Sequence, residues 1–155
     1  MYIKILNITQ KKNILKLDTG IESTFKLLNQ ASGNLALNKI VENLLLFEGK
    51  LIIQTLFVRG WYKGHFIDNT SEKELEAWIP LIKKINPEYV MIYPIDRGTP
   101  VKELQKISEK ELKENIKFCR IFLFHLRNFF SYDIGTDNTE PNYAFTYLSL
   151  FHFFS

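Results

Sequence analysis

The sequence predicts an α/β fold in which about three parallel strands alternate with helices, followed by a C-terminal tail of different character. Apolar segments that read as strands alternate with segments of helical periodicity, and this order is typical of parallel strands joined by helices. The length of 155 residues is that of one domain, and the apolar fraction of 46% is enough for a hydrophobic core. A complete (β/α)8 barrel needs about 250 residues, so this chain cannot close one.

The N-terminal half is expected to contain two strands and two helices. The first strand is NILKLD (13–18), which ends in the turn signal DTG. Helices are expected over 21–30 and over about 35–48, because apolar residues recur there at helical spacing. The almost continuously apolar run KLIIQTLFV (50–58) is typical of a strand buried on both faces, and WYKGHFIDNT (61–70) is expected to be a loop.

A third helix is expected to follow this loop. Ser71 and Glu74 have the spacing of a capping box, in which each side chain bonds the backbone of the other residue. Apolar residues then recur at helical spacing to about residue 85. Pro80 lies inside this segment, and we expect it to kink or shorten the helix.

The last strand and helix of the patterned region follow. EYVMIYPID (88–96) is expected to be a strand that finishes at Pro94, because proline lacks the N–H that a sheet ladder needs. Ser108 and Glu111 form a second capping box, which opens a helix reaching at least Lys117. About three parallel strands leave open sheet edges, and such edges usually need a partner or a cover.

The composition changes near residue 120, which divides the chain into residues 1–120 and an atypical tail, 121–155. The tail contains no lysine and half of all the aromatic residues, and it follows neither the helical nor the strand period. Two explanations remain open. The tail is either an aromatic dock for a partner or membrane surface, or the product of translation in a second reading frame, and the abrupt loss of lysine favours the second.

The composition also excludes several classes of function. The single cysteine, Cys119, excludes an internal disulfide or an all-cysteine metal site within one chain and fits a reducing cytoplasm. No run of about 18 apolar residues predicts a transmembrane helix, and the first residues do not read as a signal peptide. The net charge of +3 is not clustered, so nucleic-acid binding is not indicated. The sequence has no Gly-rich phosphate loop, no Ser-His-Asp order and no His-x₃-His pair.

Three segments of the patterned region resemble one enzyme family, the radical S-adenosylmethionine (radical SAM) oxidoreductases. They are LDTGIESTFKLLNQ (17–30), LIIQTLFVRGWYKGHFIDNT (51–70) and AWIPLIKKINPEYVMIYPIDRGTPVKELQKISEKEL (77–112). The most specific parts are QTLFVRG and IYPIDRGTP, and the order and spacing of the segments add weight. The resemblance implies that residues 1–120 form a partial, incomplete (β/α) barrel.

The family's defining motif is absent from this chain. Members hold a [4Fe–4S] cluster on Cys-x₃-Cys-x₂-Cys, and the cluster cleaves S-adenosylmethionine reductively; thiolates hold such clusters. We therefore expect a fragment of such an enzyme that is inactive alone, with no catalytic residue, no metal site and no cofactor in this chain. The alternative is a non-catalytic interaction module that docks on a partner carrying the missing half, or self-associates through its open sheet edges. A gene remnant that scarcely folds is a third hypothesis.

The candidate binding residues follow the ends of the expected strands, where such barrels place their chemistry. By resemblance, Asp18 would accept hydrogen bonds from the ribose hydroxyls of S-adenosylmethionine; alternatively it makes an Asx-turn with Gly20. One of Gln54 and Thr55 must face inward, toward a cofactor or substrate or as a hydrogen-bonded core group.

The remaining candidates, Arg59, Asp96 and Arg97, follow two of the expected strands. An arginine at a strand end can clamp a carboxylate or a phosphate. Alternatively, Asp96 and Arg97 fix their own loop through caps and an ion pair.

Overall fold

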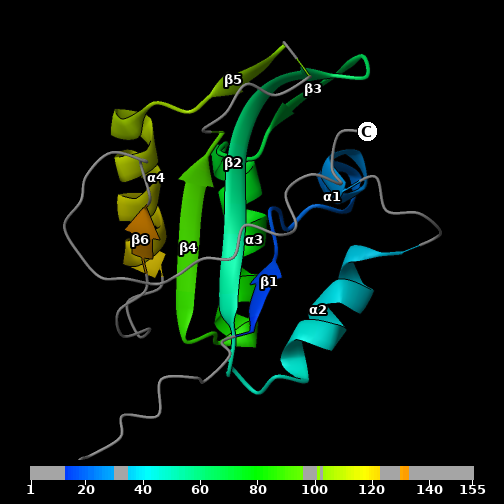
Figure 1. The fold of residues 1–155 in the computed structure, drawn as a ribbon, viewed down its shortest axis with the longest axis vertical. Helices are drawn as coiled ribbons and strands as arrows, with labels where there is room; N and C mark the ends of the chain where they lie inside the picture. Colours follow the sequence, from blue (N-terminus) through cyan, green and yellow to red (C-terminus); the bar gives the residue numbers. More distant parts are fainter. Residues whose placement is uncertain (1–12, 30–34, 96–100, 102, 123–129, 133–155) are drawn as a thin grey trace, which may run out of the picture.

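The computed structural model describes residues 13–29, 35–95, 101, 103–122 and 130–132. Its helices are α1 (Glu22–Asn29), α2 (Leu37–Leu45), α3 (Glu72–Ile85) and α4 (Glu109–Phe122). Its strands are β1 (Ile14–Lys16), β2 (Ile52–Tyr62), β3 (His65–Asp68), β4 (Tyr89–Pro94), β5 (Leu104–Lys106) and β6 (Phe130–Tyr132). Figure 1 shows β2 as the long central strand, which the other strands flank.

The strand β2 pairs with four of the other strands of one six-stranded sheet. Its first half pairs in parallel with β1 on one edge and with β4 on the other, and β4 pairs in parallel with β6. Its second half pairs antiparallel with β3 and with β5. An 11-residue strand is long for a globular protein, and its length lets it pair with parallel strands in its first half and antiparallel strands in its second.

The sheet corrects the predicted fold class. A segment of a (β/α) barrel contains parallel strands alone, whereas the described sheet is open and mixed, because β3 and β5 run antiparallel to β2. The predicted partial barrel is therefore wrong. Its strands β1, β2 and β4 do lie near the expected segments, but the expected loop 61–70 is largely a β-hairpin.

The β2–β3 hairpin turns on Lys63 and Gly64. Both residues have positive φ, 50° and 76°, and a two-residue turn with two positive φ values matches the twist of the strands beside it. Tyr62 and His65 are paired across the turn. The sequence signal was weak because lysine, unlike asparagine or aspartate, rarely takes positive φ.

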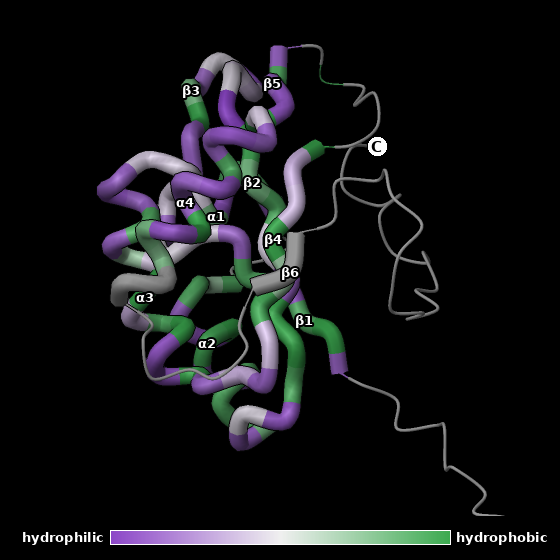
Figure 2. Tube along the Cα trace, turned by 90° about the vertical axis from the view of Figure 1, so that its left-hand side faces the viewer, coloured by the Kyte–Doolittle hydropathy of each residue, from purple (hydrophilic) through white to green (hydrophobic). Residues whose placement is uncertain are grey.

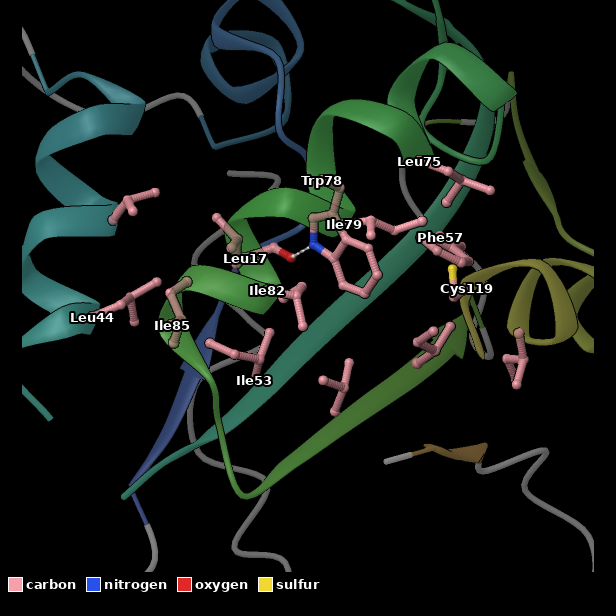
Figure 3. Packing of buried hydrophobic residues seen from close by; sticks show 14 of the residues in the cluster. Leu17, Leu44, Ile53, Phe57, Leu75, Trp78, Ile79, Ile82, Ile85 and Cys119 are labelled. Atoms are coloured by element: carbon pink, nitrogen blue, oxygen red, sulfur yellow. Dashed lines mark hydrogen bonds between the residues drawn. The ribbon is translucent and has the colours of Figure 1, made fainter. Parts of the chain in front are cut away.

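Helices cover one face of the parallel strands. Figures 1 and 2 show α2, α3 and α4 on the same side of the sheet. The main core lies between these layers and includes Ile53, Phe57, Trp78, Ile82 and Leu112 (Figure 3). A second, smaller core lies under the antiparallel strands and contains Val58, Tyr62, Ile67 and Leu104. The two cores meet along β2.

The helix α3 begins differently from the prediction. Ser71 is its N-cap residue, but its side chain makes no capping hydrogen bond, so the predicted box with Glu74 is wrong. The buried Glu74 carboxylate instead accepts hydrogen bonds from the hydroxyls of Thr19 and Thr24. The helix runs through Pro80 and ends at Ile85, close to its predicted end, so Pro80 does not shorten it.

The end of the described chain crosses the predicted boundary at residue 120. The helix α4 continues to Phe122, and the Ser108 hydroxyl accepts a hydrogen bond from the Glu111 N–H, as half of the predicted capping box. The strand β6, within the predicted tail, pairs with β4. The rest of the tail lies outside the described residues. Among the described helices, none is long and apolar enough to cross a membrane.

Candidate functional site

Asp18 lies just beyond the end of β1, beside the middle of β2. One carboxylate oxygen accepts the Leu56 N–H at 2.8 Å, and the other lies 2.9 Å from the Lys16 ammonium. Burial raises the pKa of Asp18, and the charge of Lys16 partly offsets this effect. Burial, and then the negative charge of Asp18, also raises the pKa of Tyr93. The carboxylate thus supplies an acceptor for the Leu56 N–H where β1 has ended.

Asn69 continues the same edge of β2. Its side-chain nitrogen donates to the carbonyls of Asp18 and Leu56, at 2.9 and 2.7 Å, and its oxygen accepts the Val58 N–H at 2.8 Å. Asn69 is 2% exposed. Asp18 and Asn69 together therefore fill the stretch of β2 where β1 has ended and β3 has not yet begun.

Gln54 and Thr55 point to opposite faces of β2, as the alternation of a strand requires. Thr55 is fully buried, and its hydroxyl donates to the Leu17 carbonyl at 2.9 Å. The Trp78 ring nitrogen donates to the same carbonyl, also at 2.9 Å (Figure 3). Thr55 is therefore a hydrogen-bonded core group, which was one of its two sequence-based interpretations.

Arg59 lies within β2 rather than after it. Its guanidinium pairs with Asp68 and Glu111, each at 2.6 Å, and donates to the Thr70 hydroxyl at 2.9 Å. The Asp68 side chain also accepts bonds from Thr70. This network ties β2 and β3 to α4. Asp96 and Arg97, the other charged candidates, lie outside the described residues.

The structure thus brings Asp18 close to β2 and separates the other candidates. Thr55 lies in the main core and Arg59 in a surface network, so they do not share one site. Their predicted contacts with a cofactor stay predictions. Sequence reasoning did not find Glu74 and Asn69 as buried anchors, because their partners are remote in sequence: Thr19 is 55 positions from Glu74.

Cys119 lies in the main core and is fully buried. Burial raises the pKa of its thiol to about 12, so the thiolate that metal binding or nucleophilic attack requires is disfavoured. Within the residues that the structure describes, no three His, Cys, Asp or Glu side chains gather as a metal site would require. The chain's one cysteine does not fit an iron–sulfur cluster.

An exposed aromatic pair marks the hairpin. Trp61 on β2 and Phe66 on β3 are cross-strand neighbours whose ring centroids lie 5.6 Å apart, at 68°, in an edge-to-face arrangement. Trp61 is 53% exposed and Phe66 is 55% exposed. The Lys63 ammonium lies 5.3 Å from the centroid of the Tyr62 ring at the turn beside them. This hairpin apex, defined as residues 61–66, lies at one end of the molecule (Figure 1).

No protein-family model matches the chain. Among curated proteins, the chain is similar to a protein named GTPase Obg from Brachyspira hyodysenteriae, with 25% identity over 109 residues. These residues are 68% of this chain but only 15% of that protein, so the chain spans a small part of its relative's length. The similarity is to a GTPase and not to an iron–sulfur enzyme. The predicted membership of the radical SAM family is therefore wrong, as is the expected relation to iron–sulfur enzymes. The oxidoreductase function predicted from that membership is not tested by this similarity.

Proposed function

We propose that the chain is a non-catalytic interaction module that binds another protein chain through the hairpin apex. The observation that carries the proposal is the exposed Trp61–Phe66 pair. Other large aromatic residues of the described chain, such as Phe25, Phe57 and Trp78, are buried. Tryptophan is enriched among the residues that supply most of the binding energy at protein interfaces, and phenylalanine is enriched in the buried core of such interfaces.

The surroundings of the pair suit an interface. Lys63, Gly64 and His65 at the turn are all exposed, and they give the two rings a polar margin. Protein interfaces commonly consist of an apolar centre within a polar rim. The two-residue turn and the pairing of β2 with both β3 and β5 hold the rings in place before binding, which reduces the entropy lost on association.

The polar residues elsewhere support a structural role over a catalytic one. Asp18 and Thr55 form hydrogen bonds with backbone groups, and Arg59 forms them with neighbouring side chains. The relative is named a GTPase, but the 155 residues of this chain contain no Gly-rich phosphate loop, so the proposal includes no nucleotide hydrolysis. It also includes no cofactor and no nucleic acid, and it places the module in the cytoplasm.

Photo-crosslinking tests the proposal. A benzophenone amino acid replaces Trp61 in the full chain, and the matched control carries it in place of Leu46, which is 79% exposed but follows α2 at the other end of the molecule (Figure 1). The purified chains are irradiated alone and in an extract of the organism that encodes them. We expect an adduct with a protein chain, identified by mass spectrometry, from position 61 and not from position 46.

Competition then shows whether the hairpin apex is responsible. Unlabelled wild-type chain should suppress the adduct, and a Phe66→Ala competitor should suppress it at least about tenfold less effectively, the equivalent of 1.4 kcal/mol. Equal adduct yields from the two labelled positions, or no adduct from either, would refute the proposed function.

A further inference from the structure

The register of the hairpin determines which backbone groups of β3 point outward. Tyr62 and His65 flank a two-residue turn, so they are a hydrogen-bonded pair, and hydrogen-bonded and non-hydrogen-bonded pairs then alternate along the strands. Trp61 and Phe66 therefore form a non-hydrogen-bonded pair. In agreement, the Trp61 N–H donates away from β3, to the Glu103 carbonyl at 3.2 Å. The N–H and C=O of Phe66 must accordingly point away from β2, toward the outer edge of β3.

The three outer strands around β2 differ in how they discourage edge pairing. Lysine on an edge strand is a common device against association with another strand. β1 carries Lys16, and β5 carries Lys106. β3 has the sequence HFID, with no lysine and with the exposed Phe66 at its centre. Among the described residues β3 pairs with β2 alone, so its other edge faces no described strand.

We propose that the partner at the hairpin apex is a second copy of this chain, which pairs antiparallel through β3 about a two-fold axis at Phe66. The proposal rests on the proposed function and names its partner. Each Phe66 N–H donates to the Phe66 carbonyl of the second copy, so that the sheet continues from one copy into the other. Directly opposite residues share a face of a sheet. The Trp61 and Phe66 rings of both copies then form one row of four aromatic side chains across four adjacent strands.

The charges along β3 are compatible with this pairing. With Phe66 opposite itself, His65 faces Ile67 of the second copy, and Asp68 faces Gly64 of the second copy, beside its Lys63. No two like charges lie directly opposite each other, and the one carboxylate of β3 comes near a cation. Self-complementarity of this kind is what an isologous two-fold interface requires.

The edge is short, and this limits the strength of the dimer. β3 has four residues, so the strands alone bury less than the roughly 1,200 Å² at the lower end of stable interfaces. The dimer is therefore weak and reversible, and the aromatic row carries most of its binding energy. Its dissociation constant should respond strongly to the loss of either ring.

Sedimentation velocity over a wide range of concentrations measures the dimer directly. We expect wild type to move from monomer to dimer, and Trp61→Ala and Phe66→Ala each to raise the dissociation constant at least about tenfold. Phe66→Pro removes the edge N–H as well as the ring, and proline is tolerated on edge strands, so it should abolish the dimer. Leu46→Ala is the matched control, an exposed apolar residue away from the hairpin, and it should leave the dissociation constant unchanged.

Disulfide trapping tests the register independently. Opposite residues of a hydrogen-bonded pair have Cα atoms about 5.5 Å apart, which suits a disulfide, so Phe66→Cys should form a disulfide-linked dimer on mild oxidation. His65→Cys is the control, because its two copies would lie about 8 Å apart, which is too far for a disulfide. Cys119 is buried and should not take part.

The results separate this inference from the proposed function. A wild-type chain that stays monomeric at all concentrations, or equal trapping at positions 65 and 66, overturns the second-copy inference. Adducts from position 61 to a different, identified chain would then leave the proposed function standing. A dimer that forms equally well in wild type and in both alanine variants overturns the inference and the hairpin apex together.

Discussion

Replacing Asn69 should have the largest effect of any single polar substitution in the described chain. Its side chain makes three buried hydrogen bonds to the backbone, with the carbonyls of Asp18 and Leu56 and the N–H of Val58. In Asn69→Ala these three groups lose their partner in a place that water reaches poorly. Each unsatisfied buried group destabilises by about 1–3 kcal/mol. For three groups this sums to about 3–9 kcal/mol, so we expect the free energy of unfolding to fall by at least about 3 kcal/mol, a large part of the 5–15 kcal/mol that domains usually have.

Urea denaturation followed by tryptophan fluorescence measures this loss. Trp78 is buried and bonded to Leu17, so its emission should report the unfolding of the main core. The midpoint should fall with little change in the slope m, because the same surface is exposed on unfolding. Asn38→Ala is the matched control, since Asn38 is exposed on α2, and it should change stability by less than about 0.5 kcal/mol.

A second variant separates shape from hydrogen bonding. Asn69→Asp keeps the size of the side chain and its acceptor for the Val58 N–H, but it places an oxygen against the two carbonyls. It should therefore destabilise at least as much as alanine at neutral pH. A loss below about 1 kcal/mol in Asn69→Ala would show that the edge of β2 does not depend on this amide, and the reasoning would be refuted.

Three further predictions concern buried positions. The raised pKa of Asp18 means that the folded state binds the carboxyl proton more tightly than the unfolded state does, so this group's contribution to stability falls as pH rises above the ordinary pKa of 3.8. The melting temperature of Asp18→Asn minus that of wild type should therefore increase from pH 4 to pH 8. A difference that does not change with pH would contradict this. At Gly20 a Cβ would lie 2.2 Å from the Ala77 carbonyl group, so Gly20→Ala should destabilise by about 1–3 kcal/mol in chemical denaturation. A loss below about 0.5 kcal/mol would count against the close approach of α3. Cys119, with a thiol pKa of about 12, should react with a disulfide reagent at pH 8 only after urea is added, and rapid labelling of the folded chain would show that the core is open there.

The sequence was informative where local pattern decides the structure. Hydrophobic runs gave the approximate positions of β1, β2 and β4, and helical spacing gave α3 and its end near Ile85. The direction of the remaining strands was not predicted, because the antiparallel pairing depends on a Lys63–Gly64 turn that has no strong signature. The extrapolation from three strands to a piece of a barrel therefore failed at the second half of β2.

The anchoring residues could not be predicted for a different reason. Glu74 has the right spacing for a capping box, and only the approach of α3 to residues 19–24 gives it the hydroxyls of Thr19 and Thr24. The sequence placed Asn69 at the end of a predicted loop. The backbone groups of β2 that it bonds lack a strand partner only because β1 ends before β3 begins, which the sequence does not reveal. Tertiary partners override local patterns at both positions.

The length of β2 has a consequence for the order in which the chain folds. Its second half meets β3 across a two-residue turn, and such a hairpin forms in about 1–10 μs because its ends are already close together. Its first half pairs with β4, and this pairing closes a loop of more than 30 residues between Phe57 and Tyr89. Closing such a loop costs more conformational entropy than closing the hairpin, so we expect this pairing to form later. Since both halves are one continuous strand, the early hairpin would give the later parallel ladder a rigid template to grow from. The segment that carries the exposed rings would then also be the nucleus of folding.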